Sequence, residues 1–328
     1  KPTALFNLFI FLVSLLIFSF FSFGNRADSM LLLAAALVCL GVTLEDNKRA
    51  VILLSLGLGV LIHTKFHAVI YVIPLFVYVW AMRGLRFLLP VIPITCGLII
   101  LPFLWPETFS ANNYLNLIST PAQTSFIFAT ACENFGFATL LLVPLLSLRF
   151  HAYKMDIKLD KPLAFSFWTL LVCIALECVV ASMAGSWHYH LMAFLPTMSL
   201  IQAKLIKSSG EKVSILRNFS MATIVLIWAL ATITTSFAHQ LQVVYNALDD
   251  SGDKVRKDLD SINEAYPDQL ITMGYGNKYS DTLVNLRPLL VNQNKSLYFD
   301  HNSYDVLLAA SMNVEENVYA RIRERHYD

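Results

Sequence analysis

The chain has 328 residues, of which 56% are hydrophobic and only 14% are charged, and its mean hydropathy is +0.59. These values lie outside the range of ordinary soluble domains and indicate an integral membrane protein. The net charge of +1 provides no basic surface for a nucleic acid, so that class of partner is excluded.

Nine strongly apolar stretches occupy roughly the first 238 residues. A helix must cover a hydrocarbon core about 30 Å thick, and the shorter stretches need snorkelling ends or local thinning to do so. We therefore expect an all-α polytopic bundle of about nine transmembrane helices over residues 1–238. The expected spans are 5–23, 29–43, 50–63, 66–82, 87–104, 135–148, 163–183, 189–203 and 218–238.

Lys and Arg alternate between the connections of these spans. One set, at 44–49, 83–86, 149–162 and 204–217, carries thirteen of them when Lys1 is included, whereas the opposite set carries only Arg26 and Lys65. By the positive-inside rule the rich side is cytoplasmic. Short loops favour a bacterial inner membrane, and nine crossings leave the C-terminal tail on the outer, periplasmic side.

The polar tail, residues 239–328, reads as a small α/β domain. A helix with apolar residues at helical spacing precedes Pro267, and 270–275 resembles a short buried strand. A second strand is expected at 296–300, followed by helices over 303–311 and 314–325.

Function is expected where polar groups collect at the outer ends of spans, because a charge near the bilayer needs a partner or water. The first such cluster precedes the second span and contains Arg26 and Asp28. Asp28 or Ser29 could cap the helix while Arg26 lies among the headgroups. Alternatively, the pair holds a phosphorylated substrate, since a guanidinium binds two phosphate oxygens together.

The second cluster is His63-Thr64-Lys65-Phe66-His67. Lys65 could simply snorkel to the headgroups. With two flanking histidines, however, it offers three nitrogen donors, and we expect Lys65 and His67 to neutralise a leaving phosphate.

The third cluster contains His188, Tyr189 and His190. Tyr189 is explained equally well as an interfacial belt residue. The i, i+2 spacing lets the two imidazoles converge only in an extended loop, where they would donate hydrogen bonds to phosphate or ligate a divalent metal, the one candidate cofactor.

The fourth cluster is acidic. Glu133 borders the longest outward connection, and Glu177 lies about two turns inside the seventh span. Since an unpaired carboxylate at that depth costs several kcal/mol, we expect Glu177 to face the bundle interior. It would serve there either as a helix-to-helix hydrogen bond or in a polar cavity.

Two stretches carry a resemblance to a known family. Phe23 to Leu33, with Gly57-Leu58-Gly59-Val60 leading to Lys65, resembles the "R-x-D-x-L-L... G-x-G... K" stretch of membrane glycosyltransferases with the GT-C fold. These include bacterial enzymes similar to protein mannosyltransferases and to the aminoarabinose transferase of lipid A. Gly185 to Pro196 is similar to their late "H-Y-x-x-x-x-x-P" stretch, with the match at His188 or His190, Tyr189 and Pro196.

The resemblance implies transfer of a sugar from a polyprenyl-phosphate carrier to a lipid, glycan or protein acceptor at the outer face. Cations at headgroup depth would hold the leaving phosphate, a role open to Arg26, Lys65, His188 and His190. A carboxylate would take the proton of the acceptor, and negative charge would stabilise an oxocarbenium-like state.

The sequence departs from the family pattern in one respect. The usual catalytic carboxylate of the family lies in a large outward loop between its first two spans, and no such loop occurs here. We expect that two spans precede Lys1 in the whole protein, and we take Asp28 as the candidate catalytic residue present. Two other interpretations stay open: a transporter or flippase for a lipid-linked or anionic substrate, and a noncatalytic membrane subunit.

Overall fold

The computed structural model describes most of the apolar part of the chain. The described residues are 2–18, 28–106, 109–112, 114–115, 126–183, 188–209 and 224–234, with 257–258, 260–262 and 264–265 in the tail. Within these residues every regular element is a helix, as the expected all-α bundle requires.

The helices that the structure describes are α-helices and short 3₁₀ helices. In chain order they are α1 (Pro2–Ile17), α3 (Asp28–Thr43), α4 (Asn47–Thr64), the 3₁₀ helix η1 (Phe66–Tyr71), α5 (Ile73–Arg83), α6 (Leu85–Leu88), α7 (Val91–Ile100), η2 (Leu101–Leu104), α9 (Phe128–Lys154), α10 (Lys161–Val180), η4 (His188–Phe194) and α11 (Leu195–Ser209). A further helix covers Ile224–Thr234.

Two of the expected spans differ from a plain α-helix at their starts. Residues 66–71 and 188–194 are 3₁₀ helices, and only then do α5 and α11 begin. Pro74 and Pro196 each occupy the second position of the α-helix that follows. Proline is well suited to the first turn because its missing N–H has no helical partner there, so each proline marks the start of a new helix.

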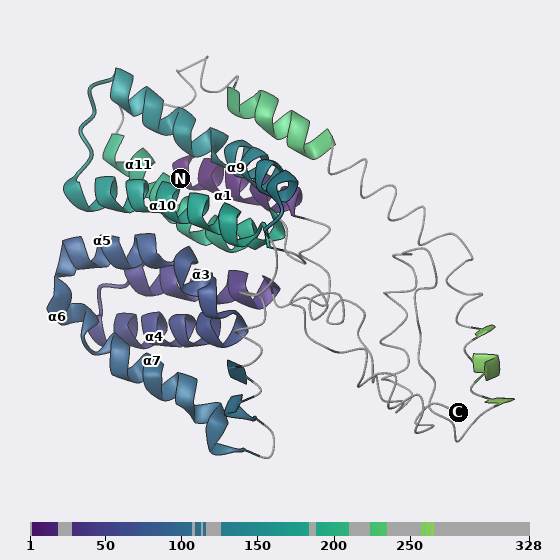
Figure 1. Ribbon diagram of the computed structural model, residues 1–328. Helices are drawn as coiled ribbons and strands as arrows, with labels where there is room; N and C mark the ends of the chain where they lie inside the picture. The colour runs from purple at the N-terminus through teal and green to yellow at the C-terminus, as the bar shows by residue number, and fades with distance from the viewer. Residues whose placement is uncertain are drawn as a thin grey trace. The chain divides into compact units, whose positions relative to one another are not determined.

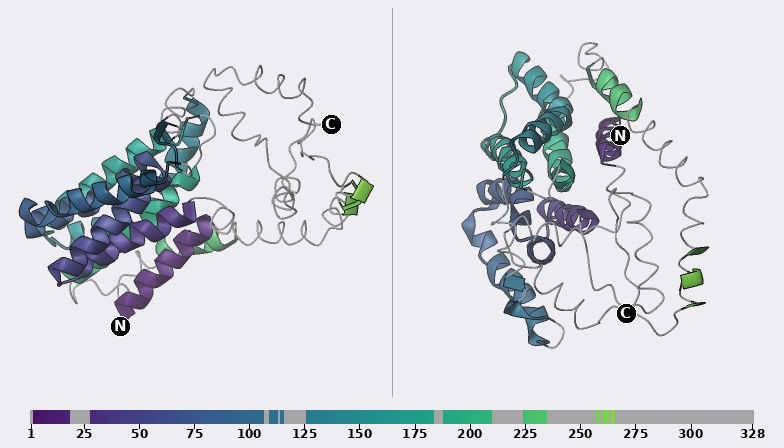
Figure 2. Two further views of the ribbon diagram at one scale, coloured as in Figure 1. Left: turned by 90° about the horizontal axis from the view of Figure 1, so that it is seen from below. Right: turned by 45° about the vertical axis from the view of Figure 1, so that its right-hand side comes forward.

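The helices pack side by side in two neighbouring groups (Figures 1 and 2). One group holds α3, α4, α5 and α7, and the other holds α1, α9, α10 and α11; α10 packs on α5 to join them. The most extensive contact is between α3 and α4. A Cβ on Gly57 would lie 2.8 Å from Ala34 O and 2.7 Å from Val38 Cγ2, so only glycine allows this spacing.

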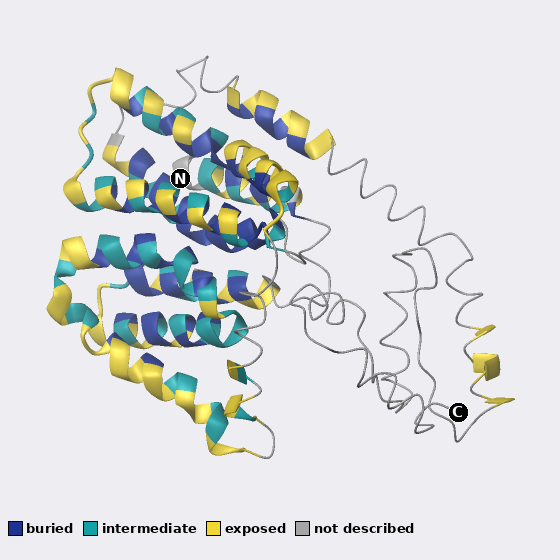
Figure 3. Cartoon of the chain, viewed as in Figure 1, coloured by how far each residue is buried: buried dark blue, intermediate teal, exposed yellow. Residues whose placement is uncertain are grey.

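The outer surface of the bundle is apolar. On α10, Trp168 and Val172 are 61% and 58% exposed, while Leu170 and Ile174 on the opposite face are buried. Figure 3 shows a similar exposed stretch along α7. A contiguous apolar exterior of this kind marks a surface that contacts lipid.

Among the residues that the structure describes, three helices are long and apolar enough to cross a membrane: Leu85–Leu104, Phe128–Lys154 and Lys161–Val180. The shorter apolar helices have 10–17 residues. The structure therefore indicates a membrane protein, whereas the full count of nine spans stays a prediction.

Most of the basic residues that the structure describes lie at one end of the bundle. The short connections from α3 to α4, from α5 to α7 and from α9 to α10 meet at that end (Figure 1). Asp46 caps α4 there by accepting from the backbone N–H groups of Lys48 and Arg49, and Asp160 caps α10 in the same way through Leu163. The other end of the same helices carries Lys65 and the polar groups considered next.

The chain divides into two compact units, residues 1–118 with 126–237 and residues 119–125 with 238–328. In the second unit, residues 257–258, 260–262 and 264–265 are helical, within the stretch where a helix is expected before Pro267. The predicted strands at 270–275 and 296–300 and the helices at 303–311 and 314–325 lie outside the described residues.

Candidate functional site

Two chain segments supply the polar end of the bundle. Lys65 follows α4 in an extended conformation (φ −152°, ψ 124°) and leads into η1, which carries His67. The second segment is η4, which begins with His188, Tyr189 and His190. Residues more than 120 positions apart in the sequence thus reach one place.

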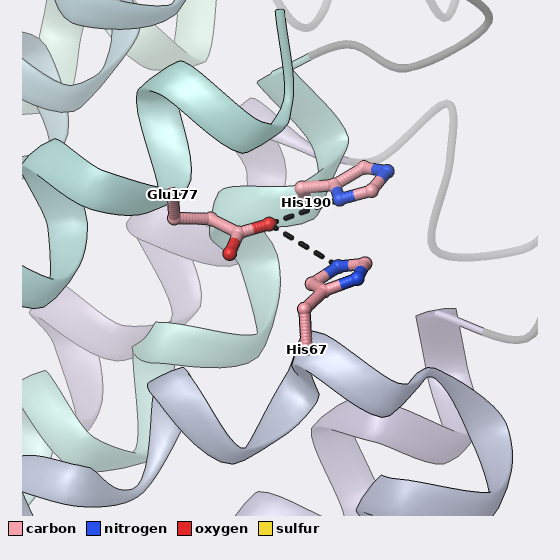
Figure 4. A group of neighbouring side chains, drawn as sticks. All are labelled: His67, Glu177 and His190. Atoms are coloured by element: carbon pink, nitrogen blue, oxygen red, sulfur yellow. Dashed lines mark hydrogen bonds and ion pairs between the residues drawn. The ribbon is translucent and has the colours of Figure 1, made fainter. Parts of the chain in front are cut away.

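Glu177 is the group on which both segments converge (Figure 4). It lies near the end of α10, is fully buried, and accepts a hydrogen bond on Oε1 from the hydroxyl of Tyr71 at 3.0 Å. His190 Nδ1 lies 3.0 Å from the same oxygen and His67 Nε2 lies 3.5 Å from it. Three side chains therefore share one carboxylate oxygen.

His190 lies between Glu177 and Lys65. Its ring is 5% exposed, and its Nε2 is 3.4 Å from Lys65 Nζ. Because a carboxylate only accepts, Nδ1 carries the proton in this arrangement, and Nε2 presents its lone pair to the ammonium group. The result is a continuous polar chain from a buried carboxylate to a half-buried cation.

Aromatic rings flank this chain. Lys65 Nζ lies 5.3 Å from the centroid of the Tyr189 ring, a distance suited to a cation–π interaction. The rings of His67 and His190 are stacked almost parallel, with centroids 5.4 Å apart and an interplanar angle of 7°. Such rings restrict the orientation of the polar groups that they cover.

Buried hydrogen bonds fix the backbone around the site. Thr197 Oγ1 donates to Tyr71 O at 2.9 Å and so ties α11 to η1. Ser166 Oγ donates to Pro74 O at 2.8 Å and ties α10 to α5. Beneath them, the rings of Tyr71 and Phe194 meet edge to face at 4.9 Å. The site therefore rests on side chains that are packed together and hydrogen-bonded.

His188 lies in a different environment from His190. Residues 188–190 form the first turn of η4 and not an extended loop, and the His188 ring stacks on Phe137 of α9 with a centroid distance of 3.8 Å. Burial lowers the pKa of His188 to about 4, although the charge of Glu133 opposes this shift. At neutral pH His188 is thus uncharged, and it adds no positive charge to a phosphate site.

The other candidates are placed as follows. Glu133 is exposed in the second turn of α9. His63 Nε2 lies 3.1 Å from Leu98 O, so this imidazole points to α7 and not to Glu177. Arg26 lies outside the described residues.

For Asp28 the structure describes the backbone alone. Gly57 faces Ala34 and Val38, and Gly41 faces Ala50 and Leu54. This antiparallel register brings Asp28, the first residue of α3, level with the end of α4, where Lys65 follows.

The structure thus brings together Lys65, His67, Glu177, Tyr189 and His190. Sequence reasoning missed Tyr71, because an aromatic residue within an apolar run carries no signal of a polar role. Three donor atoms, one each from His67, Glu177 and His190, lie within 4.8 Å of one another and are spaced as metal ligands are.

Comparisons with known proteins give no relative. No family model matches the chain, and neither a curated protein nor a solved structure matches it. The function must therefore be inferred from the residues of this site.

Proposed function

We propose that the chain is a membrane glycosyltransferase of the GT-C type that moves a sugar from a polyprenyl-phosphate donor to an acceptor at the outer face of a bacterial inner membrane. The observation that carries the proposal is the 3.4 Å approach of Lys65 Nζ to His190 Nε2 at the end of an apolar helix bundle. A half-buried ammonium group that an imidazole holds in place at that depth suits a lipid-borne phosphate.

The chemistry assigns a role to each part of the site. The bond between the anomeric carbon and the phosphate oxygen breaks, and the electron pair stays on the phosphate. Lys65 stabilises the negative charge that develops there, and Glu177 holds His190 in position beside Lys65. The acceptor oxygen forms the new bond to the anomeric carbon.

The proton of the acceptor hydroxyl must pass to a base. Asp28 is our candidate, because its backbone begins α3 at the level of Lys65. A carboxylate at that position would also be near enough to the phosphate end of the donor to favour positive charge on the sugar.

Binding of the leaving lipid tests the phosphate site without knowledge of the sugar. Full-length protein in detergent is titrated with undecaprenyl phosphate, and thermal stabilisation is measured. Undecaprenol, which has the same chain without the phosphate, is the ligand control. We expect stabilisation by the phosphate only, and Lys65→Met should weaken it about 10- to 100-fold, since a charge-assisted hydrogen bond contributes about 1.5–3 kcal/mol.

A matched variant separates this effect from a general loss of positive charge. Lys207 is exposed in the last turn of α11, at the other end of the bundle, and Lys207→Met should leave binding unchanged. Equal binding of undecaprenol and undecaprenyl phosphate would refute the phosphate site.

Turnover tests the transferase itself. Proteoliposomes receive polyprenyl-phosphate-linked mannose, glucose or aminoarabinose together with extracted envelope lipids, and release of polyprenyl phosphate is followed. Consumption of one donor that Lys65→Met and Asp28→Asn both abolish is the expected result. Movement of an intact donor across the bilayer, without consumption, would instead favour the flippase interpretation.

A further inference from the structure

We propose that His67, Glu177 and His190 form a binding site for a divalent first-row transition metal such as Zn²⁺. This inference goes beyond the proposed transferase activity, because it concerns a resident ion and not the sugar donor. It also names a ligand set different from the His188 and His190 pair that the sequence suggests.

The spacing of the donor atoms supports the site. His190 Nδ1 and His67 Nε2 lie 3.0 Å and 3.5 Å from Glu177 Oε1, and all three atoms fall within 4.8 Å of one another. Two ligands that each lie about 2.1 Å from a tetrahedral metal are separated by about 3.4 Å. Small side-chain adjustments would therefore bring all three atoms to coordination distance.

The second oxygen of Glu177 gives an independent indication. Oε2 is buried and has no hydrogen-bond partner among the residues that the structure describes. A buried carboxylate oxygen without a partner is costly, and a bound cation would satisfy it. Tyr71, which donates to Oε1, then plays the usual part of a group that orients a ligating carboxylate.

The donor set selects the class of metal. Two imidazoles and one carboxylate suit zinc, iron, cobalt or manganese, whereas magnesium and calcium prefer oxygen ligands. His67, whose side chain is 30% exposed, leaves a route by which the ion can enter.

Metal binding would also change the role of His190. Coordination through Nδ1 places the ring proton on Nε2, which faces Lys65 Nζ at 3.4 Å. The two nitrogens would then both be donors, and an anion between them would be bound by both. The metal thus converts an acceptor into a second donor beside Lys65.

Metal content measured on the full chain tests the proposal. Protein in detergent is stripped with a chelator, loaded with Zn²⁺ or Co²⁺, passed through a desalting column and analysed for metal, in the absence of any sugar donor. We expect one ion for each chain. The Co²⁺ form should show d–d absorption bands and no thiolate charge-transfer band, because no cysteine belongs to the ligand set.

Variants locate the ion. His67→Gln and Glu177→Gln should each lower the affinity for Zn²⁺ at least tenfold, and Tyr71→Phe should lower it about 10- to 100-fold as an orienting group. His188→Gln is the matched control, because His188 lies two residues from His190 in the same helix and is equally buried. It should bind Zn²⁺ as the unaltered chain does.

The proposal is overturned if the unaltered chain retains no Co²⁺, or if His67→Gln and Glu177→Gln retain as much as His188→Gln. His67→Gln keeps the test decisive if a variant at a fully buried position does not fold. Because no donor is present, failure of the metal site is distinguishable from failure of the transferase proposal.

Discussion

The two 3₁₀ segments share a backbone design but differ in exposure. η1 and η4 each precede an α-helix that carries proline in its second position, and each contributes a histidine to Glu177. In η1 only Ala68 and Tyr71 are buried, and Lys65 and His67 remain half-buried. In η4 all residues except Tyr189 are buried.

This difference assigns distinct roles to the two segments. We call η4 the wall, because it is buried and its histidines contact α9 and α10. We call η1 the edge, because its partly exposed side chains can be reached by a ligand. Glu177 joins the two, since it binds groups from both. If Glu177 couples the wall to the edge, substitutions in this network should change the stability of the protein and its binding of phosphate.

The largest expected effect comes from removal of the shared carboxylate. Glu177→Ala should lower the free energy of unfolding by about 3–5 kcal/mol, because Tyr71 and His190 then lose a buried acceptor. Thermal unfolding of the full chain in detergent measures the loss.

Glu177→Gln is the control for this variant. Its amide oxygen can still accept from the Tyr71 hydroxyl, so we expect a clearly smaller loss of stability. If the alanine variant were as stable as the unaltered chain, the proposal that Glu177 joins η1 to η4 would be refuted.

A second prediction concerns the part of the pH dependence of stability that comes from His188 in η4. Because the pKa of His188 is about 4 in the folded protein and near 6.5 in the unfolded chain, the unfolded chain binds more protons between these values. The contribution of His188 to stability should therefore fall as the pH drops from about 6.5 to 4, by at most about 3 kcal/mol, and this contribution should change no further below that window.

The variant His188→Gln isolates this titration. Unfolding temperatures of the variant and the unaltered chain are compared across the pH range in one detergent. Their difference should shrink as the pH falls through the window, since the variant has no imidazole to protonate at this position. A constant difference would show that His188 is already accessible to protons in the folded protein.

The sequence allowed much of this end of the bundle to be predicted. Lys65, His67 and His190 were recognised because a cation or imidazole at the end of an apolar span needs a polar environment. Glu177 was expected to face the interior, and it is fully buried. The shared oxygen that joins these residues depends on tertiary packing, which a pattern of residues does not contain.

The separation of His188 from His190 could not be predicted from their spacing. In a 3₁₀ helix successive residues are turned by about 120°, so residues i and i+2 point in different directions. The Gly57-Leu58-Gly59-Val60 stretch gives a similar lesson. Gly57 allows α3 to approach α4, and Gly59 lies against Leu98 of α7, so both glycines have a packing role that their family resemblance did not reveal.

The smallest effect is expected from the hydrogen bond that ties η1 to α11, the helix that directly follows η4. Thr197→Val replaces the hydroxyl that donates to Tyr71 O with a methyl group of similar size. The carbonyl oxygen of Tyr71 then loses a buried donor, and stability should fall by about 1 kcal/mol. Thr169→Val is the matched control, because Thr169 Oγ1 donates to Phe165 O within its own helix at an exposed position.

The control variant should change stability by only a few tenths of a kcal/mol. A second measurement makes the test specific to the site: Thr197→Val should also weaken the thermal stabilisation by undecaprenyl phosphate, since Tyr71 positions Glu177 and, through it, His190 beside Lys65. If Thr197→Val lowered stability yet left phosphate binding unchanged, α11 would hold η1 in place without any influence on the binding of phosphate.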